Sequence, residues 1–447
     1  MKLFGTDGIR GKANQPPMTG EMAFKIGRAA AYVLKKKDGR GMILIGKDTR
    51  LSGYMLESAL TSGICSMGVN VVLVGPMPTP GIAFITRSLR VDAGIVISAS
   101  HNPYDDNGIK FFSSDGFKLP DDIEREIESA VFSETLENVR PLGSQIGRAY
   151  RVDDAAGRYI EYIKATFPKG MTLEGMKIVV DCANGASYKI TPWVLRELGA
   201  EVIAINDKPD GLNINAGCGS THPEAMQNAV LEHRADIGIA HDGDGDRAIL
   251  CDEKGRIVDG DMIMGICAAE MKKEGRLKGD TVVATVMSNI GLERFLNKSG
   301  INLIRTQVGD RYVTGEMLNG GYNLGGEQSG HIIFMDYNTT GDGAITALQV
   351  LAIMSKNGKP LSELVSPISI CPQILINVPV QRPRKIEDFP VVVKAIENAQ
   401  GRLKDGRILV RTSGTESKVR IMVEGNNMHN IKEVAEELMG IIKSNMT

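Results

Sequence analysis

Residues 42–74, MILIGKDTRLSGYMLESALTSGICSMGVNVVLV, hold the pattern that decides the fold. The apolar stretch 42–45 predicts a short strand, a polar loop follows it, and residues 54–67 predict a helix. Gly68 then ends the helix, as glycine does at little cost in the left-handed conformation, and residues 69–74 predict a second strand. Because a helical crossover joins parallel strands, this stretch predicts one unit of an α/β domain.

The same order of strand, polar loop, helix, glycine and strand recurs twice further along the chain. The predicted strand, helix and strand lie at 177–180, 190–198 and 201–205 in the second copy, and at 281–286, 291–298 and 302–304 in the third. Three related α/β domains follow from this internal repeat. They suit a chain of 447 residues, which is more than one hydrophobic core usually organises.

The residues after 370 follow a different plan and predict a small α+β domain. Its predicted strands are 374–380, 408–410 and 418–423, and its predicted helices are 386–399 and 430–443. The predicted fold class is therefore α/β, with three related domains that contain mixed, largely parallel sheets and a C-terminal α+β domain. The predicted domains are residues 1–150, 151–253, 254–370 and 371–447. Ligands of open α/β sheets bind beyond the carboxyl ends of the strands, so the loops after strands are the candidate sites.

The composition is that of an ordinary soluble protein, with 42% hydrophobic and 24% charged residues. A formal net charge of −2 gives no general electrostatic case for a nucleic-acid partner. The apolar runs are far shorter than the roughly 18 residues of a membrane span, and Met1-Lys2-Leu3 opens no signal peptide. We therefore expect a cytoplasmic protein with no membrane partner. Its six scattered cysteines include no C-x-x-C pair and predict reduced thiols in the core.

Three aspartates at alternate positions, Asp242, Asp244 and Asp246, follow an apolar strand. An extended chain points alternate side chains the same way, and carboxylate oxygens are preferred ligands of Mg²⁺ and Ca²⁺. An EF-hand calcium loop is the competing interpretation, but it requires glycine where Arg247 stands and helices on both sides. A solvated acidic turn is disfavoured because three carboxylates this close repel one another. The segment predicts a divalent metal site.

Ser100 lies in a second candidate loop, residues 98–103, SASHNP, which follows a predicted strand at 94–97. A hydroxyl beside His101 is a candidate nucleophile. The spacing differs from the G-x-S-x-G elbow, however, and Ser, Asn and Pro are common in plain turns. The residues alone leave the plain turn open and do not choose between Ser98 and Ser100.

Residues 411–420, RTSGTESKVR, combine hydroxyls, a glycine and two guanidinium groups. Backbone N–H groups and hydroxyls can surround a phosphate, and arginine binds one through paired hydrogen bonds. The candidate phosphate ligands are Arg411, Ser413, Gly414, Thr415 and Arg420. A hairpin turn with its arginines facing water is the alternative.

Two further segments punctuated by glycine are weaker signals. Residues 325–331, GGEQSGH, place Glu327 and Ser329 on one face of an extended stretch, which suits sugar hydroxyls. Residues 4–11, FGTDGIRG, offer Arg10 to an anion.

Taken together, these segments resemble the α-D-phosphohexomutases over the whole length of the chain. The loops at 98–103, 242–247, 326–331 and 411–420 are similar, in the same order, to that family's phosphoserine, metal, sugar and phosphate loops. Residues 4–11, residues 308–311 and Gln328 look like the branch that acts on glucosamine phosphates rather than on mannose or glucose phosphates.

The resemblance implies a heart-shaped molecule whose four domains surround a central cleft, each supplying one loop. It implies a magnesium-dependent isomerase that interconverts glucosamine 6-phosphate and glucosamine 1-phosphate through a phosphoserine and a 1,6-bisphosphate intermediate. Glucosamine or glucose 1,6-bisphosphate would be the activator. A small-molecule sugar phosphate is the expected partner, and a homodimer stays open.

The resemblance also assigns roles to residues of this chain. The implied metal ligands are Ser100, Asp242, Asp244 and Asp246. The implied catalytic residues are the phosphoserine Ser100, the charge-balancing Arg10, His101 and Arg247, and the proton-transfer candidates Lys110 and His331. The implied substrate ligands are Glu327 and Ser329 for the sugar, and Arg411, Ser413, Gly414, Thr415 and Arg420 for the phosphate that does not react.

Two alternatives stay open at this point. One is another phosphohexomutase, acting on mannose or glucose phosphates, because a pocket discriminates only modestly between an amino group and a hydroxyl. The other is a metal-binding module without turnover. Ser100 beside an intact Arg247 and phosphate loop counts against the second.

Overall fold

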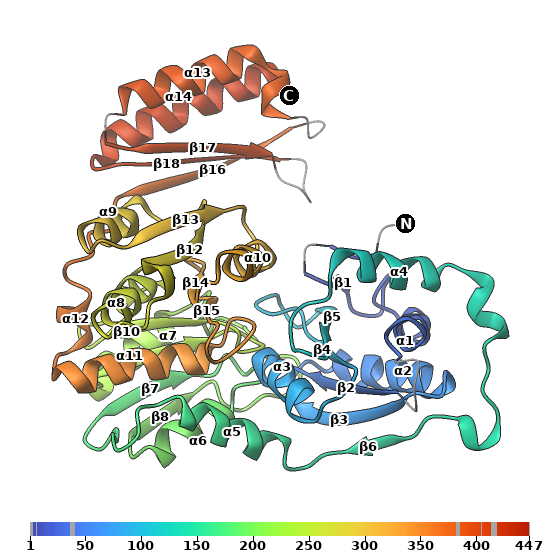
Figure 1. The fold of residues 1–447 in the computed structure, drawn as a ribbon. Coiled ribbons are helices and arrows are strands. Elements are labelled where there is room, and N and C mark those ends of the chain that lie inside the picture. The colour runs from blue at the N-terminus through green and yellow to red at the C-terminus, as the bar shows by residue number, and fades with distance from the viewer. Residues whose placement is uncertain are drawn as a thin grey trace.

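The computed structural model describes residues 3–5, 7–35, 41–380, 385–403, 405–412 and 418–446 (Figure 1). Four sheets follow one another along these residues, each with helices packed against it. The first three sheets share one plan and the fourth has another. This architecture confirms the predicted fold class.

The first sheet has six strands. Its elements are β1 Ile9–Lys12, α1 Gly20–Leu34, β2 Met42–Lys47, α2 Ser52–Ser66, β3 Asn70–Pro76, α3 Thr79–Ser88, β4 Ala93–Ile97, β5 Asp106–Ser113, α4 Asp121–Val131 and β6 Ala149–Arg151. The spatial order is β1-β5-β4-β2-β3-β6, in which β5 runs antiparallel to both of its neighbours and the other pairings are parallel. The predicted strand–helix–strand unit is β2–α2–β3, and Gly68 behind α2 has a φ of 78°.

The second and third sheets have five and four strands. The elements of the second are α5 Ala155–Ala165, β7 Lys177–Asp181, α6 Ile190–Glu197, β8 Glu201–Ile205, α7 Glu224–His233, β9 Ile237–His241, β10 Ala248–Asp252 and β11 Ile257–Val258. Those of the third are α8 Gly260–Lys273, β12 Thr281–Thr285, α9 Ile290–Lys298, β13 Asn302–Thr306, α10 Asp310–Gly320, β14 Leu324–Gly326, β15 Ile332–Phe334, α11 Gly343–Asn357 and α12 Leu361–Leu364. Gly199 and Gly300, behind α6 and α9, also have positive φ, as predicted.

One topology recurs in these three sheets. Three parallel strands are joined by two helical crossovers, the first strand lies in the middle, and a fourth strand returns antiparallel beside the third. The orders are β5-β4-β2-β3, β10-β9-β7-β8 and β15-β14-β12-β13. The turn between the third and fourth strands occupies the same place in each repeat. It contains residues 98–105 in the first repeat, 242–247 in the second and 327–331 in the third, which are the candidate loops.

The second and third repeats share one hydrophobic core, in which Tyr159 of α5 and Leu348 of α11 are both buried. The first repeat has its own core on both faces of its sheet. Strand β6 still pairs with β3, so the predicted boundary at residue 150 falls within a strand of the first sheet. The predicted domain boundaries remain a prediction.

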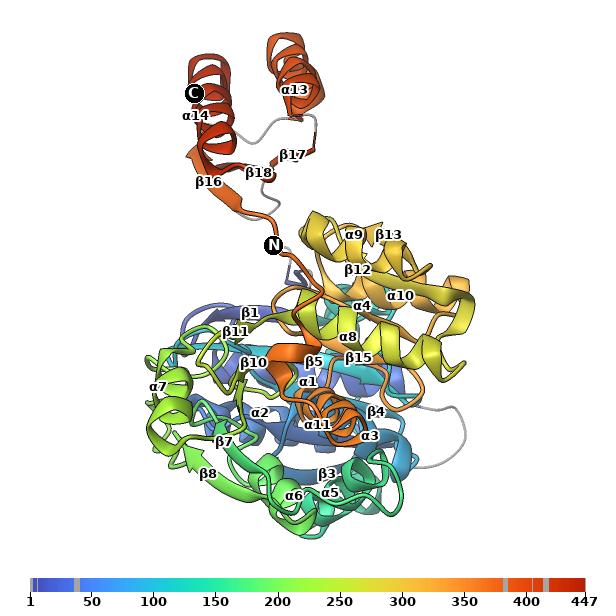
Figure 2. The same cartoon turned by 90° about the vertical axis from the view of Figure 1, so that its left-hand side faces the viewer.

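The C-terminal part is an antiparallel sheet with two helices and a core of its own. Its elements are β16 Gln373–Pro379, α13 Pro390–Arg402, β17 Arg407–Thr412, β18 Lys418–Glu424 and α14 Met428–Met446. Both views place α13 and α14 on the face of this sheet that is turned away from the third repeat (Figures 1 and 2). Helix α13 begins at Pro390 rather than at 386, because residues 386–388 form a separate 3₁₀ turn and proline favours the first helical turn.

Two expectations concern the whole chain. All six cysteines are free, and five of them are buried, which confirms the predicted reduced thiols. Among the described residues, no helix is both long and apolar enough to span a bilayer.

Candidate active site

Ser100 stands at the turn between β4 and β5 with its backbone in the left-handed conformation, at a φ of 52°. This conformation costs a non-glycine residue about 1 kcal/mol or more, and such strain persists only where the surroundings hold it. The buried hydroxyl donates to Asp242 Oδ2 at 2.6 Å and lies 3.4 Å from His101 Nδ1. The first two repeats therefore meet at Ser100.

A buried guanidinium holds the backbone of this turn. Arg50, which is fully buried beside Asp48, donates through Nη2 to the carbonyls of Ser100 at 3.1 Å and Asn102 at 2.5 Å. Asn215 of the second repeat donates to the same two carbonyls at 2.9 and 3.0 Å. Sequence reasoning missed both residues. The available signal for Arg50 was its place in the polar loop directly after β2.

Ser98 has a different task from Ser100. Its hydroxyl accepts a hydrogen bond from the Ser100 backbone N–H at 2.9 Å, so Ser98 supports the turn. Of the two serines, Ser100 is the one whose hydroxyl donates to the carboxylate cluster.

The three aspartates of the second repeat converge at the turn between β9 and β10. Each offers a carboxylate oxygen within 4.8 Å of the others, and all three are buried. One oxygen of Asp244 and one of Asp246 have no hydrogen-bond partner among the described residues. Burial, together with the charges of Asp246 and Asp244, raises the pKa of Asp242 well above its usual value. A divalent cation would relieve this repulsion and use the orphaned oxygens, so the donor set fits a metal ion.

Three cationic side chains border the carboxylates. Lys110 Nζ lies 2.9 Å from Asp244 Oδ2 and 3.3 Å from Asp7 Oδ2, and Arg10 pairs with Asp7 at 2.5 Å. Burial opposes the charge of Lys110, but Asp244 and Asp7 outweigh burial and raise its pKa. Arg247 completes the set, with Nε 3.9 Å from Asp242 and 3.8 Å from Asp246.

The two histidines of the site have opposite electrostatic surroundings. Burial and the nearby Arg247 and Arg10 lower the pKa of His101 to about 4, so its ring is neutral at pH 7. His331 Nδ1 lies 3.5 Å from Asp246 Oδ2, and although burial opposes its charge, Asp246 raises its pKa to about 9. The third repeat thus reaches the carboxylate cluster through His331.

The candidate sugar loop also lies at the turn between β14 and β15. Glu327 accepts from the Gly309 backbone N–H at 3.1 Å through Oε1, and Gly309 has a φ of 129° that excludes other residues without strain. Ser329 Oγ is buried and has no hydrogen-bond partner among the described residues. A buried hydroxyl without a partner is a candidate contact for a ligand.

The segment 308–311 joins the third repeat to the first. Asp310 pairs with Lys118 at 2.5 Å, and Lys118 also contacts Asp7. Arg311 pairs with Asp121 and with Glu124 of α4. Sequence reasoning singled out this segment but gave it no task, because its partners lie far away in the chain.

The predicted phosphate loop is described only at its two ends. Ser413, Gly414 and Thr415 lie outside the described residues. Arg411 of β17 stands opposite Arg420 of β18 in the antiparallel register. Burial and the positive charge of Arg420 lower the pKa of Arg411. Two guanidinium groups held side by side favour an anionic ligand.

Models of four domain families match the chain in order. They are described as Phosphoglucomutase/phosphomannomutase, alpha/beta/alpha domain I at residues 1–138, domain II at 157–255, domain III at 259–369, and the C-terminal domain at 375–441. The chain therefore belongs to the phosphoglucomutase/phosphomannomutase family of phosphohexomutases, as the sequence predicted.

One relative is named for a single activity within this family. A protein of Geobacter metallireducens named phosphoglucosamine mutase is 60% identical over 443 residues, which cover 99% of this chain and 98% of that protein. The chain is thus an enzyme of the isomerase class, as expected.

Solved structures agree on the fold. A phosphoglucomutase/phosphomannomutase family protein from Burkholderia thailandensis has a TM-score of 0.81 and 26% identity, covering 99% of this chain and 97% of that one. An N-acetylphosphoglucosamine mutase from Aspergillus fumigatus, solved with GlcNAc-6P and magnesium, has a TM-score of 0.70 and 17% identity, covering 100% and 96%.

Proposed function

We propose that this enzyme interconverts glucosamine 6-phosphate and glucosamine 1-phosphate. The observation that carries the proposal is the Ser100 hydroxyl, held 2.6 Å from Asp242 at the edge of a buried carboxylate cluster that cations from the first two repeats surround. The similarity to proteins named phosphoglucosamine mutase supports the choice of an amino sugar.

Ser100 carries the phosphoryl group in this proposal. It passes the group to the free hydroxyl of the sugar phosphate, which gives a 1,6-bisphosphate. The other phosphate of that bisphosphate then returns to Ser100, so that atoms and charge balance over one cycle. Glucosamine or glucose 1,6-bisphosphate is the expected activator, because either can phosphorylate Ser100.

The metal would be Mg²⁺, held by Asp242, Asp244, Asp246 and an oxygen on Ser100. When bound, it supplies positive charge that stabilises the transferring phosphoryl group. Arg10 and Arg247 add fixed positive charge at the same place. A phosphate on Ser100 would also raise the pKa of the neighbouring His101, because it adds negative charge beside the ring.

Proton transfer with the sugar hydroxyl falls to Lys110 or His331. The carboxylates beside them raise the pKa of both groups, and a cation held by Asp244 and Asp246 would offset those charges and lower both pKa values, so that one of the two can take the hydroxyl proton while the other donates a proton to the leaving Ser100 oxygen. Glu327 and Ser329 orient the sugar through its hydroxyls. The phosphate that does not react binds Arg411 and Arg420, together with Ser413, Gly414 and Thr415. We place the enzyme in the cytoplasm.

The test has two parts. Intact-mass measurement before and after incubation with glucose 1,6-bisphosphate should show one added phosphoryl group, which peptide mapping assigns to Ser100. A coupled assay should then show turnover of glucosamine 6-phosphate that requires Mg²⁺ and exceeds turnover of mannose and glucose 6-phosphates. Preference for one of the other two sugars would overturn the amino-sugar assignment.

A further inference from the structure

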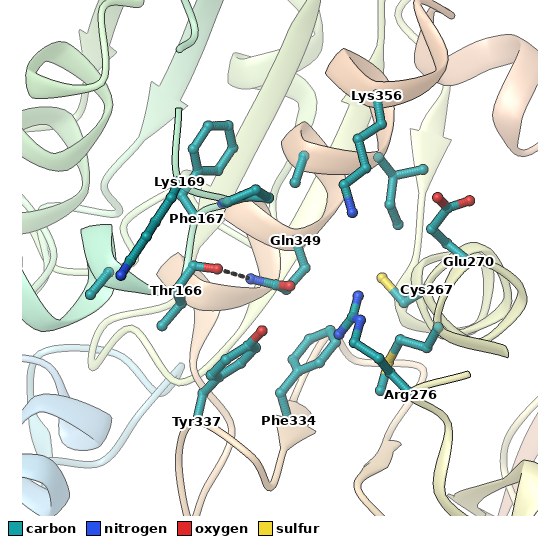
Figure 3. Close-up of a pocket in the computed structure, with 15 residues that line it drawn as sticks. Thr166, Phe167, Lys169, Cys267, Glu270, Arg276, Phe334, Tyr337, Gln349 and Lys356 are labelled. Atoms are coloured by element: carbon teal, nitrogen blue, oxygen red, sulfur yellow. Dashed lines mark hydrogen bonds between the residues drawn. The ribbon is translucent and has the colours of Figure 1, made fainter. Parts of the chain in front are cut away.

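A cavity of about 330 Å³ lies between the second and third repeats (Figure 3). Its walls come from the segment after α5, from α8 and α11, and from the segment after β15. None of the residues assigned above to the reaction lines it. Its volume is at the small end of metabolite-binding sites.

A buried amide stands in the middle of this cavity. Gln349 is 8% exposed. It is a polar residue within the buried part of α11, residues 343–354. Its nitrogen donates to the carbonyl of Thr166 at 3.2 Å, while its oxygen faces the cavity (Figure 3). Among the described residues, no hydrogen bond to that oxygen is present. An amide oxygen that faces the cavity and is not used within the protein can accept a hydrogen bond from a polar ligand.

Two cations line the cavity, Arg276 behind α8 and Lys356 of α11. Arg276 and Lys356 point into the cavity (Figure 3), and both pair with the same carboxylate, Glu274. Glu270, which also lines the cavity, pairs with Lys273 at 3.5 Å. Two cations that share one carboxylate retain positive charge for an anion.

Aromatic rings form another wall. Phe334 and Tyr337 both line the cavity, with the Tyr337 hydroxyl directed into it (Figure 3). Flat rings of this kind stack with an aromatic or heterocyclic ligand. Charge and rings together therefore select a small anion that carries an aromatic ring.

This aromatic wall is connected to the active site by one short segment. Phe334 ends β15, which directly follows His331 and Gly330 in the chain. The segment then turns back and places the Gly341 backbone nitrogen 3.1 Å from His331 Nε2. Between these ends, Thr339 donates to the carbonyl of Gly116 in the first repeat at 2.5 Å. A displacement of Phe334 or Tyr337 is thus transmitted to both sides of His331.

We propose that this cavity binds a small aromatic anion, a phosphate, sulfonate or carboxylate, and that occupancy changes turnover through the segment 334–341. The binding site stands independently of the proposed function. Only the effect on rate rests on that function and on the role of His331 in it.

The probe for the test is 8-anilinonaphthalene-1-sulfonate, an aromatic sulfonate whose fluorescence rises in apolar surroundings. Titration of the full-length protein should show one saturable site. Lys356→Gln should weaken binding about tenfold or more, because a charge-assisted hydrogen bond is lost. Gln349→Leu should weaken it severalfold, and Ala352→Leu should block it by filling the cavity.

The matched control is Lys359→Gln, which removes the same charge three positions further along, where the side chain is exposed and pairs with Glu363. Its affinity should equal that of the wild type. No saturable site, or equal affinity in Lys356→Gln and Lys359→Gln, overturns the binding site. Lys356 is partly exposed, so its substitution should not prevent folding. The comparison of Lys356→Gln with Lys359→Gln therefore tests the binding site even if Ala352→Leu does not fold.

The rate effect is tested with the same probe. At a probe concentration that just saturates the wild type, kcat of the mutase reaction should change at least twofold in the wild type and in Lys359→Gln, and much less in Lys356→Gln, whose site is mostly empty at that concentration. An unchanged kcat with the site occupied overturns the coupling. The titration needs no turnover, so it decides the binding site even if glucosamine phosphates are not the substrates.

Discussion

The three repeats and the C-terminal domain differ in the charges that they place at the site. The repeats combine carboxylates with cations, whereas the C-terminal sheet places two arginines opposite one another. Around Ser100, carboxylates and cations interlock within about 4 Å, and most of them are buried. In the C-terminal sheet, Arg411 and Arg420 stand opposite one another, and the pKa of Arg411 is lowered. The first arrangement combines both signs of charge and is organised before a substrate arrives, whereas the second places two positive side chains opposite one another. Electrostatic stabilisation is strongest where the charges need no rearrangement, so we expect the chemistry in the first region and only binding in the second.

The junction between the two regions is polar. Arg294 of α9 donates to Asn426 at 2.7 Å and to the carbonyl of Asp405 at 2.6 Å, and Arg407 donates to the carbonyl of Ser288 at 2.9 Å. The hydrophobic core of the C-terminal domain contains no residue of the repeats. Domains joined in this way reorient readily. In the proposed reaction, such freedom would let the bisphosphate intermediate present each of its phosphates to Ser100 in turn.

The largest expected effect comes from the nucleophile. Ser100→Ala should lower kcat by at least about a thousandfold, because it removes the hydroxyl that carries the phosphoryl group, and the other hydroxyl at the cluster, that of Thr79, is buried in α3 and donates to Asp244. The matched control is Ser98→Ala, which removes hydrogen bonds to the Ser100 N–H and to Asp48 but no hydroxyl at the carboxylate cluster, and should retain most of the activity. Comparable losses in the two variants, measured by the coupled assay, would contradict the assignment of Ser100.

The second prediction concerns the carboxylates. Asp244→Asn removes one charge from the cluster and one partner from both Lys110 and Thr79. The rate at limiting Mg²⁺ should fall roughly a hundredfold and recover in part at high Mg²⁺, because the remaining two carboxylates still bind the ion. Asp105→Asn, which changes an exposed carboxylate paired with Lys12, is the control. An unchanged dependence of the rate on Mg²⁺ would show that the metal binds elsewhere.

The third prediction tests the C-terminal region by itself. Arg420→Lys keeps the charge but loses the two-pronged geometry, and a charge-assisted hydrogen bond is worth about 1.5–3 kcal/mol. Affinity for glucosamine 1-phosphate and glucosamine 6-phosphate should fall about tenfold to a hundredfold, measured by calorimetric titration of the phosphorylated enzyme without Mg²⁺.

Both ligands must weaken together, since each presents one phosphate to the same arginines. Weakening of only one would contradict the shared site. Arg402→Lys, on the exposed side of α13 beside Glu437, is the control and should leave both affinities unchanged.

The sequence predicted the elements well because their signals are local. Apolar stretches and the glycines behind helices placed the first two strands of each repeat and the helix between them to within about two residues, as Gly68 and Gly199 illustrate. The third and fourth strands of each repeat were not recognised as part of the repeat. Their pairing depends on residues far apart in the chain, and hydrophobic periodicity does not indicate which strands pair.

The residues of the candidate site also fall into those that a local sequence pattern revealed and those that it did not. Asp242 and its neighbours were visible because their spacing is itself the signal. Arg50 and Asn215 were not, since each acts by donating to the Ser100 carbonyl from a distant segment. Such positioning residues become visible only when the fold brings them together.

The smallest expected effect concerns stability at the junction. Asp261, which is fully buried near the start of α8, accepts a hydrogen bond from the Asn289 backbone N–H at 2.8 Å. The Asn289 side chain in turn donates to the carbonyl of Cys371, at the entry to the C-terminal domain, at 3.0 Å. Burial and the charge of Asp259, partly opposed by Arg305, raise the pKa of Asp261 to about 7.

A carboxyl whose pKa is higher in the folded state than in the unfolded chain makes the protein less stable as pH rises. Between about pH 4 and pH 7 the unfolded chain releases a proton that the folded protein retains, so stability falls across this window by at most about 4 kcal/mol and stays low above it. Asp261→Asn keeps an acceptor for Asn289 and cannot ionise. Its melting temperature should therefore lose this part of the pH dependence and exceed that of the wild type by a few degrees at pH 8. The exposed substitution Asp122→Asn should keep the wild-type profile. If melting curves of Asp261→Asn and the wild type, recorded from pH 4.5 to pH 8, fall in parallel, Asp261 ionises without cost and the junction is more hydrated than its buried hydrogen bonds indicate.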